Sequence, residues 1–299
     1  MREIVKTDIP LIENLLKTVL GEGHIEDIAR LGGLTNHTYR VVYNGSMYAV
    51  RLPGEGTEDM IDRSDEEVST RLACSLELDA DLLYFAGNGA KVSTYIENAQ
   101  TMSSELFQDE YRMYQAADVL KKLHTCNVDT KVPFDVFDMA ATYEKIIKKN
   151  DVYLYDDYET VKNQVMSIKK EIDELCNPVL VPCHNDPLCE NWILGGDKMY
   201  LIDWEYAGMN DGLWDVADLS IEAGFDEAKD ELFLERYFNS DALDVQQMKH
   251  FIANKIYVDY LWTLWAKTRV PFDGQPMEDW ATERYIRFKE NIERYHSFN

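Results

Sequence analysis

The stretch HNDPLCEN (residues 184–191) decides how this sequence is interpreted, because it sets chemically active side chains at a fixed spacing. Asp186 follows His184 by two residues, and Asn191 follows Asp186 by five. The apolar segments VLVPC and WILGGDKMYLIDW lie on either side and predict short strands around a loop. A carboxylate and a carboxamide in such a loop could serve proton transfer and metal binding, or could simply form turns.

A further acid, Asp203, ends the apolar run MYLID. The order H-x-D-x4-N, an apolar strand and then I-D is typical of the catalytic loop and metal-binding aspartate of kinases. In phosphoryl transfer from ATP, one carboxylate accepts the proton of the acceptor hydroxyl, and hard oxygen ligands hold Mg²⁺. Asp186 is therefore the candidate base, and Asn191 and Asp203 are the candidate metal ligands, with His184 bracing the loop. The alternative is that these residues only form turns and cap a strand.

The composition limits the class of function. The chain has 299 residues and a net charge of −25, from 55 acidic and 30 basic residues. Such a charge disfavours nucleic-acid binding and suits a small cationic substrate, although solubility alone also explains it. No apolar run approaches the ~18 residues of a membrane span, and MREIVKTDIP is unlike a signal peptide. With five cysteines and no paired spacing, we expect a cytoplasmic protein without membrane insertion, disulfides or a zinc site.

The first part of the chain predicts an antiparallel sheet. TYRVVYNGSMYAVRLP (38–53) has two strand patterns joined at Asn44-Gly45, which is a strong hairpin signal. LLYFAGNGAKVSTYI (82–96) predicts a second hairpin, and residues 25–31 predict a fifth strand.

Helical periodicity dominates elsewhere. The predicted helices cover residues 8–20, 62–76, 106–126 and 158–176 and most of the chain after 215, with breaks at Pro271 and Gly274. The helix at 62–76 should bury Val68, Leu72 and Leu76, and the polar residues 97–105 predict a linker. We therefore expect an α+β protein with a nucleotide-binding N-terminal lobe (1–97) and a larger, mainly helical C-terminal lobe (98–299) for catalysis and acceptor binding.

The N-terminal lobe offers candidate phosphate contacts. LGGLTNHTYRV (31–41) holds small and polar residues between two strands, where backbone N–H groups can face phosphate oxygens, although GG alone often marks only a turn. Arg51 supplies a cation on the third strand, where kinases have Lys. An acid on the following helix should pair with Arg51. Glu66 and Glu67 are both candidates, and we favour Glu66 because it lies beside the expected apolar face.

These segments resemble choline/ethanolamine kinases, most closely the bacterial LicA-type choline kinases, which share a protein-kinase-like fold with aminoglycoside phosphotransferases. The resemblance extends over almost the whole chain and is carried by LGGLTNHTYRV, RLPGEGTEDMIDR, VLKKLHT, HNDPLCEN and LIDWEYAGMNDGLWDVADLSIE. It implies a bilobal kinase-like fold with ATP and Mg²⁺ as cofactors, Asp186 as base, and Asn191 and Asp203 as magnesium ligands. The nucleotide-binding residues that it implies are Gly33, Thr35, Asn36, Arg51, Glu66, Tyr95 and Glu97.

Aromatic residues near the C-terminus suggest the acceptor. Choline is a quaternary ammonium that cannot donate a hydrogen bond, so aromatic faces and a carboxylate must hold it. Trp262 and Trp265 lie three apart on one helix face and fit such a site, although a pair at this spacing is often core. The resemblance adds Tyr206 and Glu222, and Tyr285 on the last helix is a further candidate wall. We therefore predict a choline kinase.

Three alternatives stay open. Ethanolamine would fit the same aromatic residues, whereas an aminoglycoside would call for many acids and few aromatic walls. An inactive kinase-fold binding module is disfavoured, because Asp186, Asn191 and Asp203 are all present. Asp215 and Asp218 are expected to brace loops or cap helices and not to bind substrate.

Overall fold

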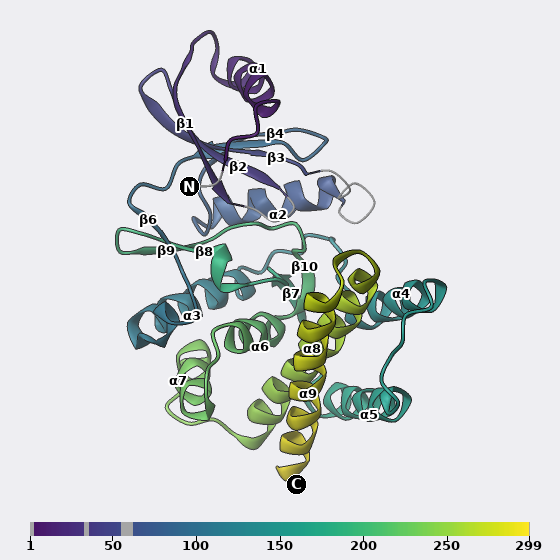
Figure 1. Cartoon of the computed structure of the whole chain (residues 1–299). Helices are drawn as coiled ribbons and strands as arrows, with labels where there is room; N and C mark the ends of the chain where they lie inside the picture. The colour runs from purple at the N-terminus through teal and green to yellow at the C-terminus, as the bar shows by residue number, and fades with distance from the viewer. Residues whose placement is uncertain (1–2, 33–35, 55–61, 299) are drawn as a thin grey trace. The chain divides into compact units, whose positions relative to one another are not determined.

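The computed structural model describes residues 3–32, 36–54 and 62–298, and Gly33 and Thr35 lie outside these residues. The chain divides into two compact units, each shown in Figure 1. The first unit comprises Met1–Met102 and Glu190–Gly208, and the second comprises Ser103–Cys189 and Met209–Asn299. The α+β class is confirmed by a mixture of helices and antiparallel sheet. In the described part of the chain, no helix is long and apolar enough to cross a membrane.

The first unit is built on the predicted five-stranded antiparallel sheet, whose strand order is β1-β2-β3-β5-β4. Its elements are α1 (Asp8–Leu20), β1 (Ile25–Gly32), β2 (His37–Tyr43), β3 (Ser46–Leu52), α2 (Arg63–Ser75), β4 (Leu82–Phe85) and β5 (Lys91–Thr94). Asn44 and Gly45 join β2 to β3 with φ angles of 50° and 78°, as a type I′ turn requires. Both predicted hairpins are therefore confirmed.

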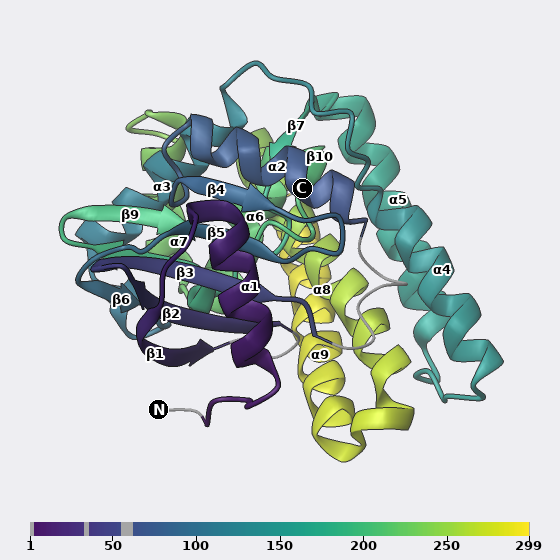
Figure 2. The ribbon, with the colours of Figure 1, turned by 90° about the horizontal axis from the view of Figure 1, so that it is seen from above.

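The two faces of this sheet have different partners. Figure 2 shows α1 lying across β1, β2 and β3. The core on this face consists of Ile12, Leu16, Tyr39, Val41, Tyr43, Val50, Leu52, Ala90 and Val92. Because successive side chains of a strand point to opposite faces, Arg51 points away from Val50 and toward α2. The sheet thus buries an apolar face under α1 and a charged residue under α2.

The prediction that α2 buries an apolar face is wrong. Val68 is 44% exposed, and the buried residues are Glu66, Ser69, Thr70 and Ala73. The helix starts after Asp62, whose side chain accepts hydrogen bonds from Ser64 and Asp65 backbone N–H groups. An ion pair made by Glu66 explains why this helix turns a mostly polar face inward.

A second sheet of the first unit contains residues far apart in sequence. Strand β6 (Ala99–Thr101) pairs with β8 (Trp192–Gly195), which forms a hairpin with β9 (Lys198–Leu201). The predicted linker at 97–105 therefore contains a strand, and all three residues of β6 are exposed, so no apolar alternation marked it. The predicted boundary after residue 97 also misses the return of residues 190–208 to the first unit.

The second unit is mainly helical. Its elements are η1 (Leu106–Gln108), α3 (Glu110–His124), α4 (Val136–Lys149), α5 (Tyr158–Cys176), β7 (Leu180–Cys183), α6 (Gly212–Glu222), α7 (Glu227–Phe238), α8 (Val245–Asp273) and α9 (Gln275–Ser297). The short elements η2 (Cys189–Asn191) and β10 (Gly208–Asp211) each span a boundary between the units. Helix α8 is central, because α4, α5, α6 and α9 all pack on it. Pro271 lies in the last turn of α8, and only Gly274, with φ of 71°, separates α8 from α9.

Candidate functional site

The hairpin β8–β9 holds the two predicted magnesium ligands in the first unit. Asn191 lies directly before β8 and Asp203 lies two residues after β9, with Trp192 paired to Leu201. The Ile202 backbone N–H donates to the Asn191 carbonyl at 2.9 Å, which keeps both residues at one end of the hairpin. Carboxylate and amide oxygens are the ligands that Mg²⁺ prefers, so this pair fits the ion.

Asp203 has an unusual backbone. Its φ is 69°, in the left-handed region that a residue with a side chain rarely adopts. Its side chain is 35% exposed, although Leu201, two residues before it, is fully buried. Strained residues of this kind concentrate at functional sites.

Arg51 connects this hairpin end to α2. One terminal guanidinium nitrogen, Nη2, lies 2.5 Å from Glu66 and donates to the Gly89 carbonyl at 2.9 Å. The other, Nη1, lies 3.1 Å from an oxygen of Asp203. Glu67 instead pairs with Arg71 at 2.7 Å. The favoured pairing of Arg51 with Glu66 is thus present, whereas a contact of Arg51 with phosphate stays a prediction.

The sequence analysis did not identify three further residues of this ion-pair network, namely Arg63, Lys91 and Glu205. Arg63 lies 2.6 Å from Glu66 and 3.5 Å from Glu205, and the Lys91 ammonium lies 3.8 Å from Glu66. Asn36, predicted in the nucleotide loop, is buried and donates to Glu205 at 3.1 Å. Glu205 could have been noticed as an acid two residues after Asp203. No sequence pattern around Arg63 or Lys91 predicts that either residue belongs to the network.

Glu205 is electrostatically linked to Asp203. Burial raises the pKa of the Glu205 carboxyl, the Asp203 charge raises it further, and Asn36 and Arg51 lower it. A buried carboxyl group beside a second negative charge creates an environment that attracts a cation. This supports the fit of the Asp203 region to a divalent metal ion.

Tyr95 and Glu97 follow β5, before β6. Tyr95 is half-buried and Glu97 is exposed. Between them, Ile96 packs so tightly against Gly195 of β8 that a Cβ on that glycine would lie 2.4 Å from the Ile96 side chain. The segment is therefore held against the hairpin, and its contact with a nucleotide base stays a prediction.

In the second unit, Asp215 of α6 holds the loop that carries Asp186. Its two carboxylate oxygens accept hydrogen bonds from the backbone N–H groups of His184 and Asn185, both at 2.7 Å. The ring of His184 in turn accepts the Asp186 N–H at 3.3 Å. Asp215 and His184 therefore both brace the loop, as predicted, and Asp186 itself is half-buried.

A second layer of contacts supports this brace. His124 lies 3.0 Å from Asp215 through Nε2 and 2.8 Å from the Tyr237 hydroxyl through Nδ1. His124, Cys183 and Asp215 offer atoms within 4.8 Å of one another, a grouping that resembles a metal site. However, burial raises the pKa of the Cys183 thiol well above its usual range, and both Asp215 oxygens are already hydrogen-bonded. We interpret the group as structural.

Three indoles form a continuous series in the second unit. The ring centroids of Trp262 and Trp265 are 6.1 Å apart, as are those of Trp265 and Trp280, and both pairs meet edge to face. Trp262 is 5% exposed, whereas Trp265 and Trp280 are half-buried. Trp280 was missed by sequence reasoning, although it lies five residues before Tyr285 on the same helix.

Arg284 of α9 contacts both Glu222 and the aromatic series. The Arg284 guanidinium forms an ion pair with Glu222 and another, at 2.9 Å, with Asp259. Its central carbon lies 4.1 Å from the Trp280 ring centroid. The predicted carboxylate therefore lies near the indoles, but with a resident cation already beside it.

Tyr285 and Tyr206 have other surroundings. Tyr285 is 4% exposed, stacks on Tyr155 with centroids 3.7 Å apart, and donates to Asp157 at 2.7 Å. One residue along a helix is a rotation of about 100°, so Tyr285 faces a different neighbour from Arg284. The structure therefore groups Tyr285 with Tyr155 and not with the indole series. Tyr206 belongs to the first unit, three residues after Asp203.

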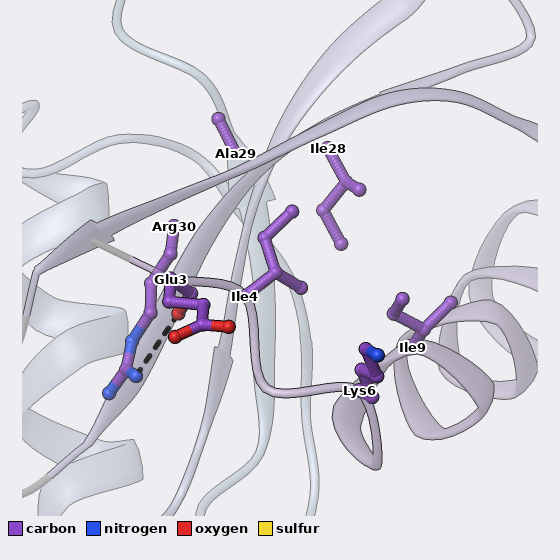
Figure 3. Close-up of a pocket in the computed structure, with 7 residues that line it drawn as sticks. All are labelled: Glu3, Ile4, Lys6, Ile9, Ile28, Ala29 and Arg30. Carbon is purple, nitrogen blue, oxygen red and sulfur yellow. Dashed lines mark hydrogen bonds between the residues drawn. The ribbon is translucent and has the colours of Figure 1, made fainter. Parts of the chain in front are cut away.

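A pocket of about 450 Å³ lies elsewhere on the first unit, between the N-terminal segment and β1 (Figure 3). It is lined by Glu3, Ile4, Lys6, Ile9, Ile28, Ala29 and Arg30, and Arg30 donates to the Glu3 carbonyl at 3.5 Å. None of these residues is a predicted site residue, so the pocket is separate from the candidate site.

The solved structures of a spectinomycin phosphotransferase and of an aminoglycoside 2'-phosphotransferase share this kinase-like fold, with TM-scores of 0.61 and 0.69 at 13% and 14% identity. The family profile of choline/ethanolamine kinases matches residues 28–269, so the chain belongs to that family. It is thus a kinase of the choline or ethanolamine class, consistent with the resemblance noted above.

Individual relatives agree with this assignment. LicA of Haemophilus influenzae is 27% identical over 263 residues, which cover 84% of this chain and 96% of LicA. A probable ethanolamine kinase of Arabidopsis thaliana is 27% identical over 299 residues, covering 86% of this chain and 78% of that protein. The choline kinase LicA of Streptococcus pneumoniae has a TM-score of 0.79 at 30% identity, covering 96% of this chain and 99% of that one. A LicA structure in complex with AMP has a TM-score of 0.76, also at 30% identity, covering 96% of this chain and 98% of that one.

Proposed function

We propose that this protein transfers the γ-phosphoryl group of ATP to the hydroxyl of choline, with Mg²⁺, and so forms phosphocholine. The choice of choline as acceptor rests on the series of three indoles. These indoles lie in the same unit as the loop that contains Asp186 and is braced by Asp215. Aromatic faces attract a cation that cannot donate hydrogen bonds, with about 0.5–2 kcal/mol for each well-placed ring.

Asp186 acts as the base. The braces from Asp215 and His184 fix the backbone N–H groups of residues 184 to 186, so that the Asp186 carboxylate keeps one position as it accepts the hydroxyl proton. Positioning of this kind supplies a large part of the acceleration in phosphoryl transfer, because little covalent chemistry is left to the protein.

Asn191 and Asp203 would hold magnesium, and Arg51 would contact a phosphate. Bound Mg²⁺ neutralises the charge that develops on the phosphoryl oxygens. The Arg51 guanidinium is oriented by Glu66 and Gly89, so it keeps a fixed direction at the Asp203 end of the hairpin. Asn36, Tyr95 and Glu97 remain proposed nucleotide contacts. The AMP bound to a LicA relative supports nucleotide use by this fold.

Ethanolamine is the second candidate acceptor, favoured by the similarity to a probable ethanolamine kinase. A coupled assay of ADP formation with choline, ethanolamine and kanamycin, each against a control without acceptor, separates the candidates. Higher kcat/KM with choline than with ethanolamine supports the proposal. Nucleotide binding without turnover of any acceptor would identify an inactive binding module.

The role of Asp186 is tested by Asp186→Asn. Loss of a general base typically reduces kcat by about 10²–10⁴-fold, while the dissociation constant of Mg·ATP should change little, because the base acts on the acceptor. Single-turnover kinetics and nucleotide titration measure the two effects. Asp138→Asn, an acid in the first turn of α4, serves as the control. Activity of Asp186→Asn within a few-fold of the unsubstituted protein would exclude this role.

A further inference from the structure

Asp218 lies on α6 between two residues of the candidate site. Asp215, Asp218 and Glu222 follow one another at spacings of three and four residues, which places them on one face of the helix. Asp215 holds the Asp186 loop at one end of this face, and Glu222 contacts Arg284 at the other. Asp218 therefore faces the region between the catalytic loop and Arg284.

The surroundings of Asp218 are unusual for a carboxyl group. The residue is 0% exposed, and neither side-chain oxygen has a hydrogen-bond partner among the residues that the structure describes. Buried polar groups are nearly always hydrogen-bonded, and an isolated buried carboxylate is very costly. Of the two acids that were expected to brace a loop or cap a helix, Asp215 does so and Asp218 does not.

The charges around Asp218 favour its neutral form. Burial raises its pKa well above the usual range, and the negative charges of Glu222, Asp186 and Asp215 act in the same direction. The Arg284 guanidinium of α9 opposes them, but it is already shared between Glu222 and Asp259. Burial and these neighbouring negative charges therefore favour the protonated form of the Asp218 carboxyl in the empty site.

We propose that Asp218 is a proton-exchanging acid of the acceptor site, which holds a proton while the site is empty and releases it when a cationic amino alcohol binds. This inference rests on the proposed function, namely that such a cation binds in the unit that carries Asp186, Glu222 and the indoles. On binding, the Asp218 O–H bond breaks, the proton passes to the buffer, and the amino alcohol is chemically unchanged. The positive charge of the bound ammonium replaces that of the released proton. The net charge of the buried cluster therefore stays nearly the same.

Isothermal titration calorimetry tests the exchange directly. Choline has no group that titrates near neutral pH, so any proton that appears must come from the protein. Titrations at pH 7 in two buffers with different ionisation enthalpies give the number of protons released. We expect between about 0.5 and 1 for the unsubstituted protein and about 0 for Asp218→Asn. The neutral carbon isostere of choline, 3,3-dimethylbutan-1-ol, should release none.

Two variants serve as controls. Glu231→Gln removes one exposed acid of α7 and should keep the full proton release. Asp186→Asn should still release a proton, although a smaller fraction of one, because Asp218 retains its carboxyl but loses one of the negative charges that favour its neutral form. Asp218→Asn is nearly isosteric with the neutral acid and should fold, as judged by circular dichroism. Asp218→Ser provides a second variant with the same expected result.

The pH dependence supplies an independent readout. Because the empty site must lose a proton, choline affinity should rise up to tenfold per pH unit until the Asp218 pKa is reached, and should be flat in Asp218→Asn. Choline binding without proton release, or equal release from Asp218→Asn, overturns this inference and leaves the proposed function standing. Failure of the unsubstituted protein to bind or phosphorylate choline and ethanolamine overturns both.

Discussion

At the scale of single residues, Asp79 shows how burial turns an ordinary carboxyl into a pH-sensitive group. The residue is 9% exposed and accepts the Ala80 N–H at 2.6 Å. Burial raises its pKa from 3.8 to about 6, while Lys91 lowers it and the Asp203 charge raises it. The folded state therefore binds this proton more tightly than the unfolded state does.

This difference predicts a pH dependence of stability. The stabilisation from protonated Asp79 is complete below about pH 4 and is lost as the pH rises through about 6, amounting to at most about 3 kcal/mol. In Asp79→Asn, the fall in free energy of unfolding between pH 4 and pH 8 should shrink by about 1–3 kcal/mol. Urea denaturation in magnesium-free buffer measures it.

Glu290→Gln provides the control for Asp79→Asn, because it removes an exposed acid from α9. Its pH profile should match that of the unsubstituted protein. Identical profiles for all three proteins would mean that Asp79 does not keep its proton on folding.

At the scale of elements, helix α9 contributes Trp280, the third indole of the series. Trp280 is half-buried, meets Trp265 edge to face, and lies under the Arg284 guanidinium. Trp262 is almost fully buried, so its truncation would also destabilise the core. Trp280 is therefore the better probe of the acceptor site.

Trp280→Ala should raise the KM for choline about 3- to 30-fold, which corresponds to the loss of one cation–π contact. The KM for ATP should stay within about twofold, since a residue that contacts only the acceptor affects only acceptor binding. Phe272→Ala, which removes an aromatic ring that is 72% exposed near the end of α8, is the control. Equal rises in both KM values for Trp280→Ala would indicate a purely structural role.

The elements differ in how far local sequence predicts them. The β2–β3 hairpin follows from Asn-Gly, because few other residues adopt positive φ at both turn positions. Helix α5 has the predicted bounds, Tyr158–Cys176, because its buried residues recur at helical spacing. Helix α2 is present close to its predicted bounds, but its buried face was misjudged because it buries the charged Glu66. Strand β6 was not predicted, because all of its residues are exposed.

At the scale of the whole molecule, the net charge of −25 creates a field that attracts cations and repels nucleotide anions. Raising the salt concentration from about 20 to about 300 mM shortens the Debye length to less than 10 Å. We expect kcat/KM for choline to fall several-fold over this range. The inhibition constant of 3,3-dimethylbutan-1-ol, which is neutral, should be nearly constant. A choline kcat/KM independent of salt would show that the overall charge serves solubility alone.

The chain enters the first unit twice, and this discontinuity was invisible in the sequence. Residues 190–208 carry Asn191, Asp203 and Glu205 and pair through β8 with β6, which lies about ninety residues earlier. Strand pairing over such distances depends on backbone hydrogen bonds that no local pattern records. A division into two continuous lobes was therefore the natural but incomplete prediction.

The sequence by itself determined the kinase-like class, the hairpins of the first sheet, and the candidate base and metal ligands, because turn residues and catalytic spacings are local. Only the tertiary structure decided that Arg51 pairs with Glu66 and Asp203, and that Trp280 and not Tyr285 continues the indole series. It also decided that Asp218 is buried with no hydrogen-bond partner among the described residues. Ion pairs, ring contacts and desolvation join residues that are distant in the chain. Their energies are set by three-dimensional proximity, which sequence spacing does not encode.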